Sequence, residues 1–535
     1  MYLTLELKTS IAQQASLATL ASFCATSRAM HAQASPTLYS HIDLDDTRRT
    51  SLLLWSLASG KHRPAALNAH PAALVRELKL WFCPSLAAEP EVEKKRAKAY
   101  QTLIQVALNN TAQYAVNGES RLRVFHWTSN YAVDRIFPLL RLRPRFQRLE
   151  DLRIAPYEMS IRQRTGFDFL QVPGLKSLGY EESTESYEIC PREVVELFAA
   201  SLRLVPTASP TLTVLDIDIT WAMHSRLAPL EEAVNSLRFP SLRFARIQVF
   251  LRSSSSHPNF CPFLEAHPSL LEVAVTLGNI KQPLRDDALP LLQTFTGHAS
   301  DFLQVYNGKR PIRDLTVSLF VFRTALRVRG ALEPSRLGGA IVAALKKLPQ
   351  LRRLAMVNRP VHYHRDSDDD DEMYKQGLDL RTLTALARAC PQLTDLEIHL
   401  DSSGDFKALA AFSELRYLKA HVWMSVPDHR GLMAKLHHAG FFDGADDGDA
   451  SLDEDKFAPA EGIRRDINLL LPALPKLRAV EVTVIGERES DLDSMDSWND
   501  DTEEKIVYEE VHAFHIRREG KKVEAVEILT DGGRM

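Results

Sequence analysis

The sequence predicts an α/β fold in which a small N-terminal helical segment precedes a long, irregular array of alternating strands and helices. Three observations predict it: a short strand phrase that recurs along the chain, prolines at a fixed distance before many of its copies, and helical spacing between copies. Hydrophobic residues make up 45% and charged residues 25% of the 535 residues, as in a soluble globular protein. The formal charge of −4 argues against a basic nucleic-acid surface over the whole protein.

The recurring phrase is an apolar residue, two variable residues, an apolar residue, one variable residue and a final apolar residue. Its fourth and sixth positions share one face of a strand, so a short strand would bury both and expose the residue between them. The phrase occurs twelve times, as VRELKL (75–80), LRVFHW (122–127), LEDLRI (149–154), LKSLGY (175–180), LTVLDI (212–217), LRFARI (242–247), LLEVAV (270–275), IRDLTV (312–317), LRRLAM (351–356), LTDLEI (393–398), LRYLKA (415–420) and LRAVEV (477–482).

Proline precedes many of these copies. It fixes φ and cannot donate a ladder hydrogen bond, so it suits the start of a strand rather than its middle. Between copies, apolar residues such as Val194, Phe198 and Leu202 recur at helical spacing. Strands joined by right-handed helical crossovers predict a parallel solenoid, with strands on the concave side and helices on the convex side. Seven copies have the proline two residues before their first apolar position: Pro173, Pro210, Pro240, Pro268, Pro349, Pro391 and Pro475.

This pattern resembles the leucine-rich-repeat fold over about Val75 to Val484. The copies begin between 22 and 62 residues apart, whereas regular repeats of this family measure about 20–29 residues, so we expect a degenerate array with long loops. Three acidic stretches are expected to form loops: Asp366–Glu372, Asp443–Asp455 and Glu487–Glu504. The expected organisation is a helical module at 1–45, a linker helix at 46–72, the solenoid at 73–484, and an acidic loop with a closing β-hairpin at 485–535.

Residues 3–44 predict three short helices with apolar residues on one face. A bundle of this size has too little core to be very stable alone, so these residues are expected to complete their burial against a partner. The order L-x-x-E-L, S-L-x-x-L, S-R-x-x-H and P-x-L-Y-x-H-I-x-L resembles an F-box. The final LYSHIDL, and the segment Leu289–Val317, are similar to F-box proteins of basidiomycete fungi.

The F-box resemblance implies a substrate-recognition subunit of an SCF-type cullin–RING ubiquitin ligase. The F-box would bind the Skp-family adaptor, and the solenoid would bind a target protein. Thr4 stands where the family has proline, and the stretch between Glu6 and Leu17 is shorter than in the family. Carried over position by position, the adaptor-contacting residues would be Leu3, Leu5, Leu7, Ile11, Leu17 and Leu20.

Two alternatives remain open from the sequence. Residues 1–45 could merely cap the first repeat of a leucine-rich-repeat scaffold with no ubiquitin-ligase role, because helix-in-groove binding and intramolecular packing use the same apolar spacing. A repeat protein that regulates an enzyme, such as the leucine-rich-repeat GTPase activators, is the third possibility.

The third, fifth and seventh positions of each phrase are expected to face outward on the concave side. The residues that would hold the target are taken from the fifth and seventh positions. Mixed charge with an exposed tryptophan is typical of an interaction surface. The candidate residues are Lys79, Trp81, His126, Arg153, Asp216, Asp218, Arg246, Glu397, His399, Lys419 and His421, with Thr128 and Gln248 beside them.

The sequence offers little for catalysis or cofactor binding. A Gly-rich phosphate loop, an H-E-x-x-H helix and a G-x-S-x-G elbow are all missing from it. We therefore predict a non-enzymatic protein without cofactor or metal. The paired histidines His362, His364 and His437–His438 are expected to be solvated loop residues.

Partners and location follow from similar arguments. Five dispersed cysteines argue against a disulfide framework or zinc module and predict buried thiols in a reducing compartment: Cys24, Cys83, Cys190, Cys261 and Cys390. Without a run of about 18 apolar residues, no membrane span is predicted. Without a stripe of alternating basic and aromatic residues, no nucleic-acid partner is predicted. We expect a cytoplasmic or nuclear protein, or one found in both compartments.

Overall fold

The computed structural model divides into two compact units, Met1–Leu292 (unit 1) and Gln293–Met535 (unit 2). Each unit combines helices with a sheet whose strands follow one another in sequence order, so the architecture is mixed α/β. The sheet is not closed. The residues that the structure describes are 19, 22, 30, 34, 36–44, 47–59, 70–82, 90–114, 120–129, 146–156, 166–183, 190–221, 228–251, 258–275, 280–318, 334–356, 380–400, 406–424, 459–489, 505–519 and 522–528.

In unit 1, every pair of neighbouring strands from β1 to β8 is parallel. The strands are β1 (His41–Leu44), β2 (Glu77–Phe82), β3 (Val124–Ser129), β4 (Asp151–Pro156), β5 (Ser177–Ser183), β6 (Val214–Trp221), β7 (Phe244–Leu251) and β8 (Glu272–Val275).

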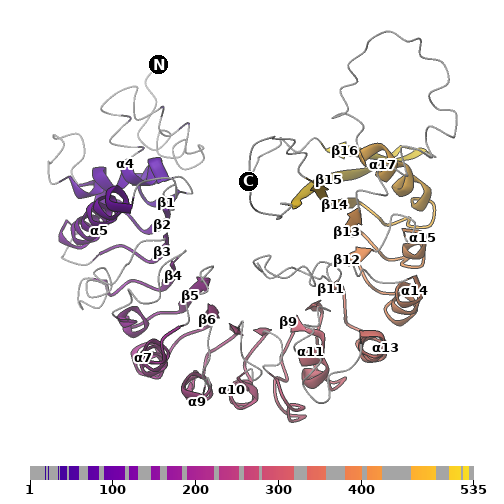
Figure 1. Cartoon of the computed structure of the whole chain (residues 1–535), viewed down its shortest axis with the longest axis horizontal. Helices are drawn as coiled ribbons and strands as arrows, with labels where there is room; N and C mark the ends of the chain where they lie inside the picture. The colour runs from indigo at the N-terminus through magenta and orange to yellow at the C-terminus, as the bar shows by residue number, and fades with distance from the viewer. Residues whose placement is uncertain are drawn as a thin grey trace, which may run out of the picture. The chain divides into compact units, whose positions relative to one another are not determined.

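The helices of unit 1 lie on one face of its strands (Figure 1). We call the opposite face the open face. The helical elements are α4 (Thr47–Ala58), η1 (Pro71–Leu74), α5 (Pro90–Gln113), η4 (Asp168–Gln171), α7 (Arg192–Leu202), α8 (Val205–Ala208), α9 (Ala228–Ser236) and α10 (Cys261–Glu265).

In unit 2 the first six of the described strands pair in parallel, as in unit 1, and the last two strands are antiparallel. Its strands β9 (Thr294–His298), β10 (Asp314–Ser318), β11 (Arg353–Met356), β12 (Asp395–Leu400), β13 (Tyr417–Met424) and β14 (Ala479–Glu489) follow one another in the sheet, with parallel pairing from β9 to β14. Strands β15 (Lys505–Glu519) and β16 (Lys522–Ile528) then add antiparallel, forming the closing hairpin expected from the sequence. The helices, again on one face (Figure 1), are α11 (Ala299–Val305), α13 (Pro334–Leu345), α14 (Leu380–Ala389), α15 (Phe406–Leu409) and α17 (Pro459–Leu470).

Each of the twelve phrases forms a strand that starts at the third position of the phrase, giving β2–β8 and β10–β14. The apolar positions are buried as expected: in the phrase that forms β3, Leu122, Phe125 and Trp127 are at most 2% exposed. The recurring prolines lie ahead of the strands and not within them: Pro173 and Pro210, for example, lie in turns before β5 and β6. The period-two pattern therefore predicted both the strands and their inward face.

Main-chain hydrogen bonds also link the second-position residues of neighbouring strands, and we call this series of bonds the backbone ladder. The N–H of Arg123 donates to the carbonyl of Arg76 at 2.7 Å, and in unit 2 the N–H of Arg416 donates to the carbonyl of Thr394 at 2.7 Å. Successive second-position residues thus lie side by side along the edge of the sheet where the parallel strands begin. We call this the amino-terminal edge.

An aromatic cluster packs between β5 and the helices that cover it. The rings of Phe167 and Phe198 meet edge to face with centroids 4.9 Å apart, and Tyr180 of β5 lies 5.4 Å from Phe198. All three rings are at most 1% exposed. This packing fixes β5, whose other face carries Gly179 and Glu181.

Besides the two strands of the closing hairpin, two further strands were not among the predicted phrases. Strand β1 falls within residues 1–45, the range expected to be a helical module, and pairs with β2. Strand β9 has Gly297 where the phrase requires its last apolar residue, so the pattern did not detect it.

One acidic stretch was predicted to begin too early. Glu487–Glu489 belong to β14, because these residues pair with Lys505–Val507 of β15. The other two acidic stretches and the paired histidines lie outside the described residues, as do Cys24 and Cys83. Cys190, Cys261 and Cys390 are buried thiols that form no disulfide, in line with the expectation for them. Within the described ranges, no helix combines the length and the apolar composition needed to cross a lipid bilayer.

Candidate functional site

The parallel register of unit 1 aligns the fifth positions of successive phrases across the open face. We call this alignment the fifth-position row. A second row contains Glu181, Asp218 and Gln248 at the seventh position. Neighbouring strands lie about 4.8 Å apart, so long side chains in these rows reach the next strand and the one beyond. The fifth-position row consists of Lys79, His126, Arg153, Gly179, Asp216, Arg246 and Ala274.

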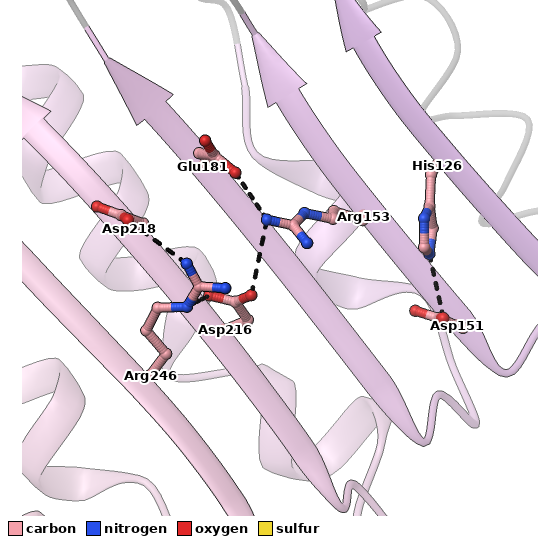
Figure 2. Close-up of polar contacts among 7 residues, drawn as sticks. All are labelled: His126, Asp151, Arg153, Glu181, Asp216, Asp218 and Arg246. Carbon is pink, nitrogen blue, oxygen red and sulfur yellow. Dashed lines mark hydrogen bonds and ion pairs between the residues drawn. The ribbon is translucent and has the colours of Figure 1, made fainter. Parts of the chain in front are cut away.

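Arg153 spans three strands of this row. Its Nη2 atom lies 2.7 Å from Oε2 of Glu181 on β5 and 3.9 Å from Oδ2 of Asp216 on β6 (Figure 2). The stem of Arg153 crosses β5 over Gly179, where a Cβ atom would lie only 2.9 Å from Cγ of Arg153. The missing side chain at Gly179 therefore provides the space through which the guanidinium reaches β6.

Arg246 approaches the same carboxylates from β7. Its Nε atom is 2.8 Å from Oδ1 of Asp216, and its Nη1 atom is 3.8 Å from Oδ2 of Asp218. Figure 2 shows these side chains on the face of the strands turned away from the helices. We call Arg153, Glu181, Asp216, Asp218 and Arg246 the charge cluster.

The charge cluster holds three carboxylates against two guanidiniums. Burial raises the pKa of Asp218 to about 6, and repulsion from Glu181 adds to this rise. Burial also raises the pKa of Asp216, although Arg246 and Arg153 oppose the rise. When all five groups are ionised the cluster has one negative charge in excess, and an incoming cation would neutralise it.

The remaining sequence-predicted residues of unit 1 lie on β2 and β3. His126 Nε2 is 3.1 Å from Oδ2 of Asp151. Burial works to raise the pKa of Asp151, but the hydrogen bond and charge of His126 outweigh it and the pKa falls below its ordinary value. Lys79 lies 3.5 Å from Asp43 of β1, and Trp81 is 42% exposed. A basic, aromatic and acidic surface thus accompanies the charge cluster on the same sheet.

Unit 2 carries its own polar group on β12 and β13. The rings of His399 and His421 stack with centroids 4.6 Å apart, and His421 Nε2 lies 3.1 Å from Glu397 Oε1. Burial, followed by repulsion from His421, lowers the pKa of His399 to about 4. Lys419 pairs with Glu481 of β14 at 2.7 Å.

The structure therefore places the predicted target-surface residues in two groups, one on each unit. Within unit 1 it joins Arg153, Asp216, Asp218 and Arg246 in a single cluster. Sequence reasoning missed Glu181, Asp151 and Glu481. Glu181 and Glu481 occupy seventh and fifth positions, so the rule that selected the others would have found them, whereas Asp151 occupies the third position. The six predicted adaptor-contacting residues, Leu3, Leu5, Leu7, Ile11, Leu17 and Leu20, lie outside the described residues.

The arrangement of charged side chains on this surface can support ionic contacts with a partner. In the part of the chain that the structure describes, no group of three or more His, Cys, Asp or Glu side chains has an arrangement that could hold a metal ion. Neither the protein-family models nor the curated proteins compared with this chain match it. Function must therefore be argued from the surface itself and from the N-terminal sequence.

Proposed function

We propose that this protein is a substrate-recognition subunit of an SCF-type cullin–RING ubiquitin ligase. Its N-terminal F-box-like segment would bind the Skp-family adaptor, and its strand–helix array would hold the target protein. The order of motifs in residues 3–44 supports the adaptor half of the proposal. The observation that carries the target half is the pair of aligned rows of half-buried charge on the open face.

We further propose that the array is a degenerate leucine-rich-repeat solenoid. Three features support this assignment: strands in sequence order with parallel pairing, helices on one face of each unit, and a backbone ladder at the amino-terminal edge of each unit. In such arrays each repeat contacts its neighbours, and the surface opposite the helices is used for binding.

The composition of the unit 1 surface suggests the chemistry of the target. The charge cluster has an excess carboxylate, so a lysine or arginine of the target would complete it. Partly buried charged groups favour complementary partners and reject like charges, which gives specificity more than raw affinity. Trp81, exposed on β2, offers an aromatic contact of the kind that often dominates binding energy.

The subunit would act by proximity. Holding the target and the ubiquitin-charged enzyme in one complex raises the effective concentration of target lysines near the reactive thioester. On this proposal no side chain of the array takes part in bond making.

The adaptor half is tested with the full-length chain, wild type against the triple variant Leu5→Ala/Ile11→Ala/Leu20→Ala. Losing three apolar contacts in a helix-in-groove interface is expected to lower recovery of purified Skp-family adaptor by at least about tenfold in a pull-down. Equal recovery of the adaptor by both proteins, or by neither, would reject the ligase role and leave a protein-binding scaffold.

The target half is tested with Glu181→Gln/Asp218→Asn, which changes the formal charge of the cluster from −1 to +1 and keeps side-chain shape. A matched control, Glu193→Gln/Glu196→Gln, removes two exposed carboxylates from α7 on the helical face. Proteins recovered with the chain are quantified by mass spectrometry. We expect a subset enriched by wild type to fall about fivefold or more with the first variant only. Equal recoveries with both variants would show that the charge cluster does not select targets.

A further inference from the structure

A cavity of about 470 Å³ opens in unit 2 where β14 begins and β15 ends. It lies where the strands of this unit begin, at the amino-terminal edge of the sheet. Arg416, Lys476, Arg478, His515 and Arg518 contribute to its walls, and its lining includes no carboxylate. A hollow of this size falls within the range of sites that hold small ligands or a single side chain.

The backbone ladder explains why cations gather here. Arg416 and Arg478 occupy the second positions of successive phrases, and the N–H of Arg478 donates to the carbonyl of Arg416 at 2.8 Å. The two exposed side chains therefore start from adjacent strands about 4.8 Å apart, close enough for both guanidiniums to contact one ligand.

The positive charges of the cavity are only partly compensated. Lys476 donates to Oε1 of Glu414 at 2.7 Å. Arg518 Nη2 donates to the carbonyls of Leu474 and Leu477 at 3.0 and 3.2 Å, which orients its guanidinium without neutralising it.

Arg416 and Arg478 themselves form no ion pair within 4.0 Å among the described residues. Glu414, which pairs with Lys476, also attracts Arg416, so the charge of Arg416 is only partly offset. An anion that contacts both guanidiniums would compensate the positive charge that remains.

We propose that this cavity binds a phosphate monoester group, contacted by Arg416 and Arg478 with Arg518 behind them. A phosphate monoester has nearly two negative charges and three acceptor oxygens at neutral pH, which matches two or three incompletely compensated guanidiniums better than a single carboxylate does. Arginine forks donate paired hydrogen bonds to phosphate oxygens, and such charge-assisted bonds are the strong ones. This inference stands on the cavity alone and does not depend on the ligase role.

The phosphate could belong to a phosphorylated side chain of a protein or to a free small phosphate ester. The test therefore measures the full-length chain at about 150 mM salt, where surface charges are screened beyond about 8 Å. The probes are inorganic phosphate, a short phosphoserine peptide with neutral flanking residues, the same peptide unphosphorylated, and a single-stranded oligonucleotide. Binding is followed by isothermal titration calorimetry.

The deciding variant is Arg416→Ala/Arg478→Ala, and the matched control is Arg313→Ala/Arg352→Ala. The control removes two exposed second-position arginines of adjacent strands β10 and β11 at the same edge, outside the lining of the cavity. We expect inorganic phosphate and the phosphopeptide to bind wild type and the control, and to lose at least about tenfold in affinity with the deciding variant.

The source follows from the ratio of the two affinities. A phosphopeptide that binds about tenfold more tightly than inorganic phosphate indicates a protein-borne phosphate, whereas equal affinities indicate a free phosphate ester. Failure of both phosphate probes to bind, equal losses in the two variants, or preference for the oligonucleotide would overturn the proposal. Circular dichroism melts of the two variants confirm that a loss of binding is not a loss of fold.

Discussion

At the residue scale, the charge cluster depends on a position that has no side chain. Gly179→Ala would place a Cβ atom 2.9 Å from Cγ of Arg153 and push the guanidinium away from Glu181 and Asp216. We expect the free energy of unfolding to fall by about 1–2 kcal/mol, as for other overpacked positions, measured by urea denaturation.

Two comparisons test whether the contact with Arg153 causes the loss of stability in Gly179→Ala. Gly339→Ala in α13 has open space around the new methyl group and should raise stability by up to about 1 kcal/mol, since alanine is the better helix former. In an Arg153→Ala background most of the cost of Gly179→Ala should disappear, because the nearest atom, Cγ, is gone and only Cβ, at 3.3 Å, remains. A persistent cost in that background would show that the backbone, and not Arg153, requires the glycine.

Asp218 is the second residue whose chemistry can be predicted. Its pKa rises from 3.8 to about 6 on folding, so the folded chain binds more protons than the unfolded chain in that range. Its contribution to stability is therefore present below pH 3.8 and is lost as the pH rises through about 6. The charged groups that face it are Glu181, Asp216, Arg153 and Arg246.

Asp218→Asn keeps this position neutral at every pH. Relative to wild type, the variant should gain about 1–2 kcal/mol of stability between pH 4 and pH 7, measured by denaturation at each pH. Asp287→Asn, at a side chain that is 79% exposed, is the matched control. A flat difference for Asp218→Asn would mean that Asp218 is not desolvated in the folded protein.

At the element scale, buried polar side chains tie the turns of successive repeats together. The hydroxyl of Ser209, fully buried ahead of β6, donates to the carbonyl of Val172 at 3.0 Å and accepts from the N–H of Leu175 at 2.9 Å. It thus joins the turn before β6 to the turn before β5. The imidazole of His267 makes a similar tie, accepting from the N–H of Phe239 at 3.1 Å.

Ser209→Ala would leave one buried donor and one buried acceptor without this partner. Such groups cost about 1–3 kcal/mol, and we expect that loss in the free energy of unfolding. Ser241→Ala, at an exposed turn position before β7, should change stability by less than about 0.5 kcal/mol. Equal effects of the two substitutions would rule out the buried tie as a source of stability.

Much at this scale could be predicted from the sequence, because strand position depends on local pattern. The twelve phrases located twelve strands and their buried faces, and the prolines lie ahead of the strands rather than within them. The pattern did not identify β9, because Gly297 stands where the phrase requires an apolar residue. The continuation of β14 through Glu487–Glu489 was missed because pairing with β15 overrides the acidic composition there.

At the scale of each whole unit, the local sequence pattern does not predict which side chains contact each other across strands. Selecting outward positions found Arg153, Asp216, Asp218 and Arg246, yet nothing local shows that Arg153 passes over one strand to reach the next. That contact requires the register of β4, β5 and β6 together with a glycine at the crossing point. The basic cavity escaped prediction for the same reason, since residues near 416, 477 and 516 meet there only through strand pairing.

The ladder at the amino-terminal edge has an evolutionary consequence. Each rung runs from a main-chain N–H to the carbonyl of the preceding repeat, so it is indifferent to which side chains those repeats carry. A duplication or loss of one complete strand–helix segment would re-form the same rungs with the new neighbour. During evolution the array, and with it the charged surface, could therefore become longer or shorter without any new type of contact between neighbouring segments.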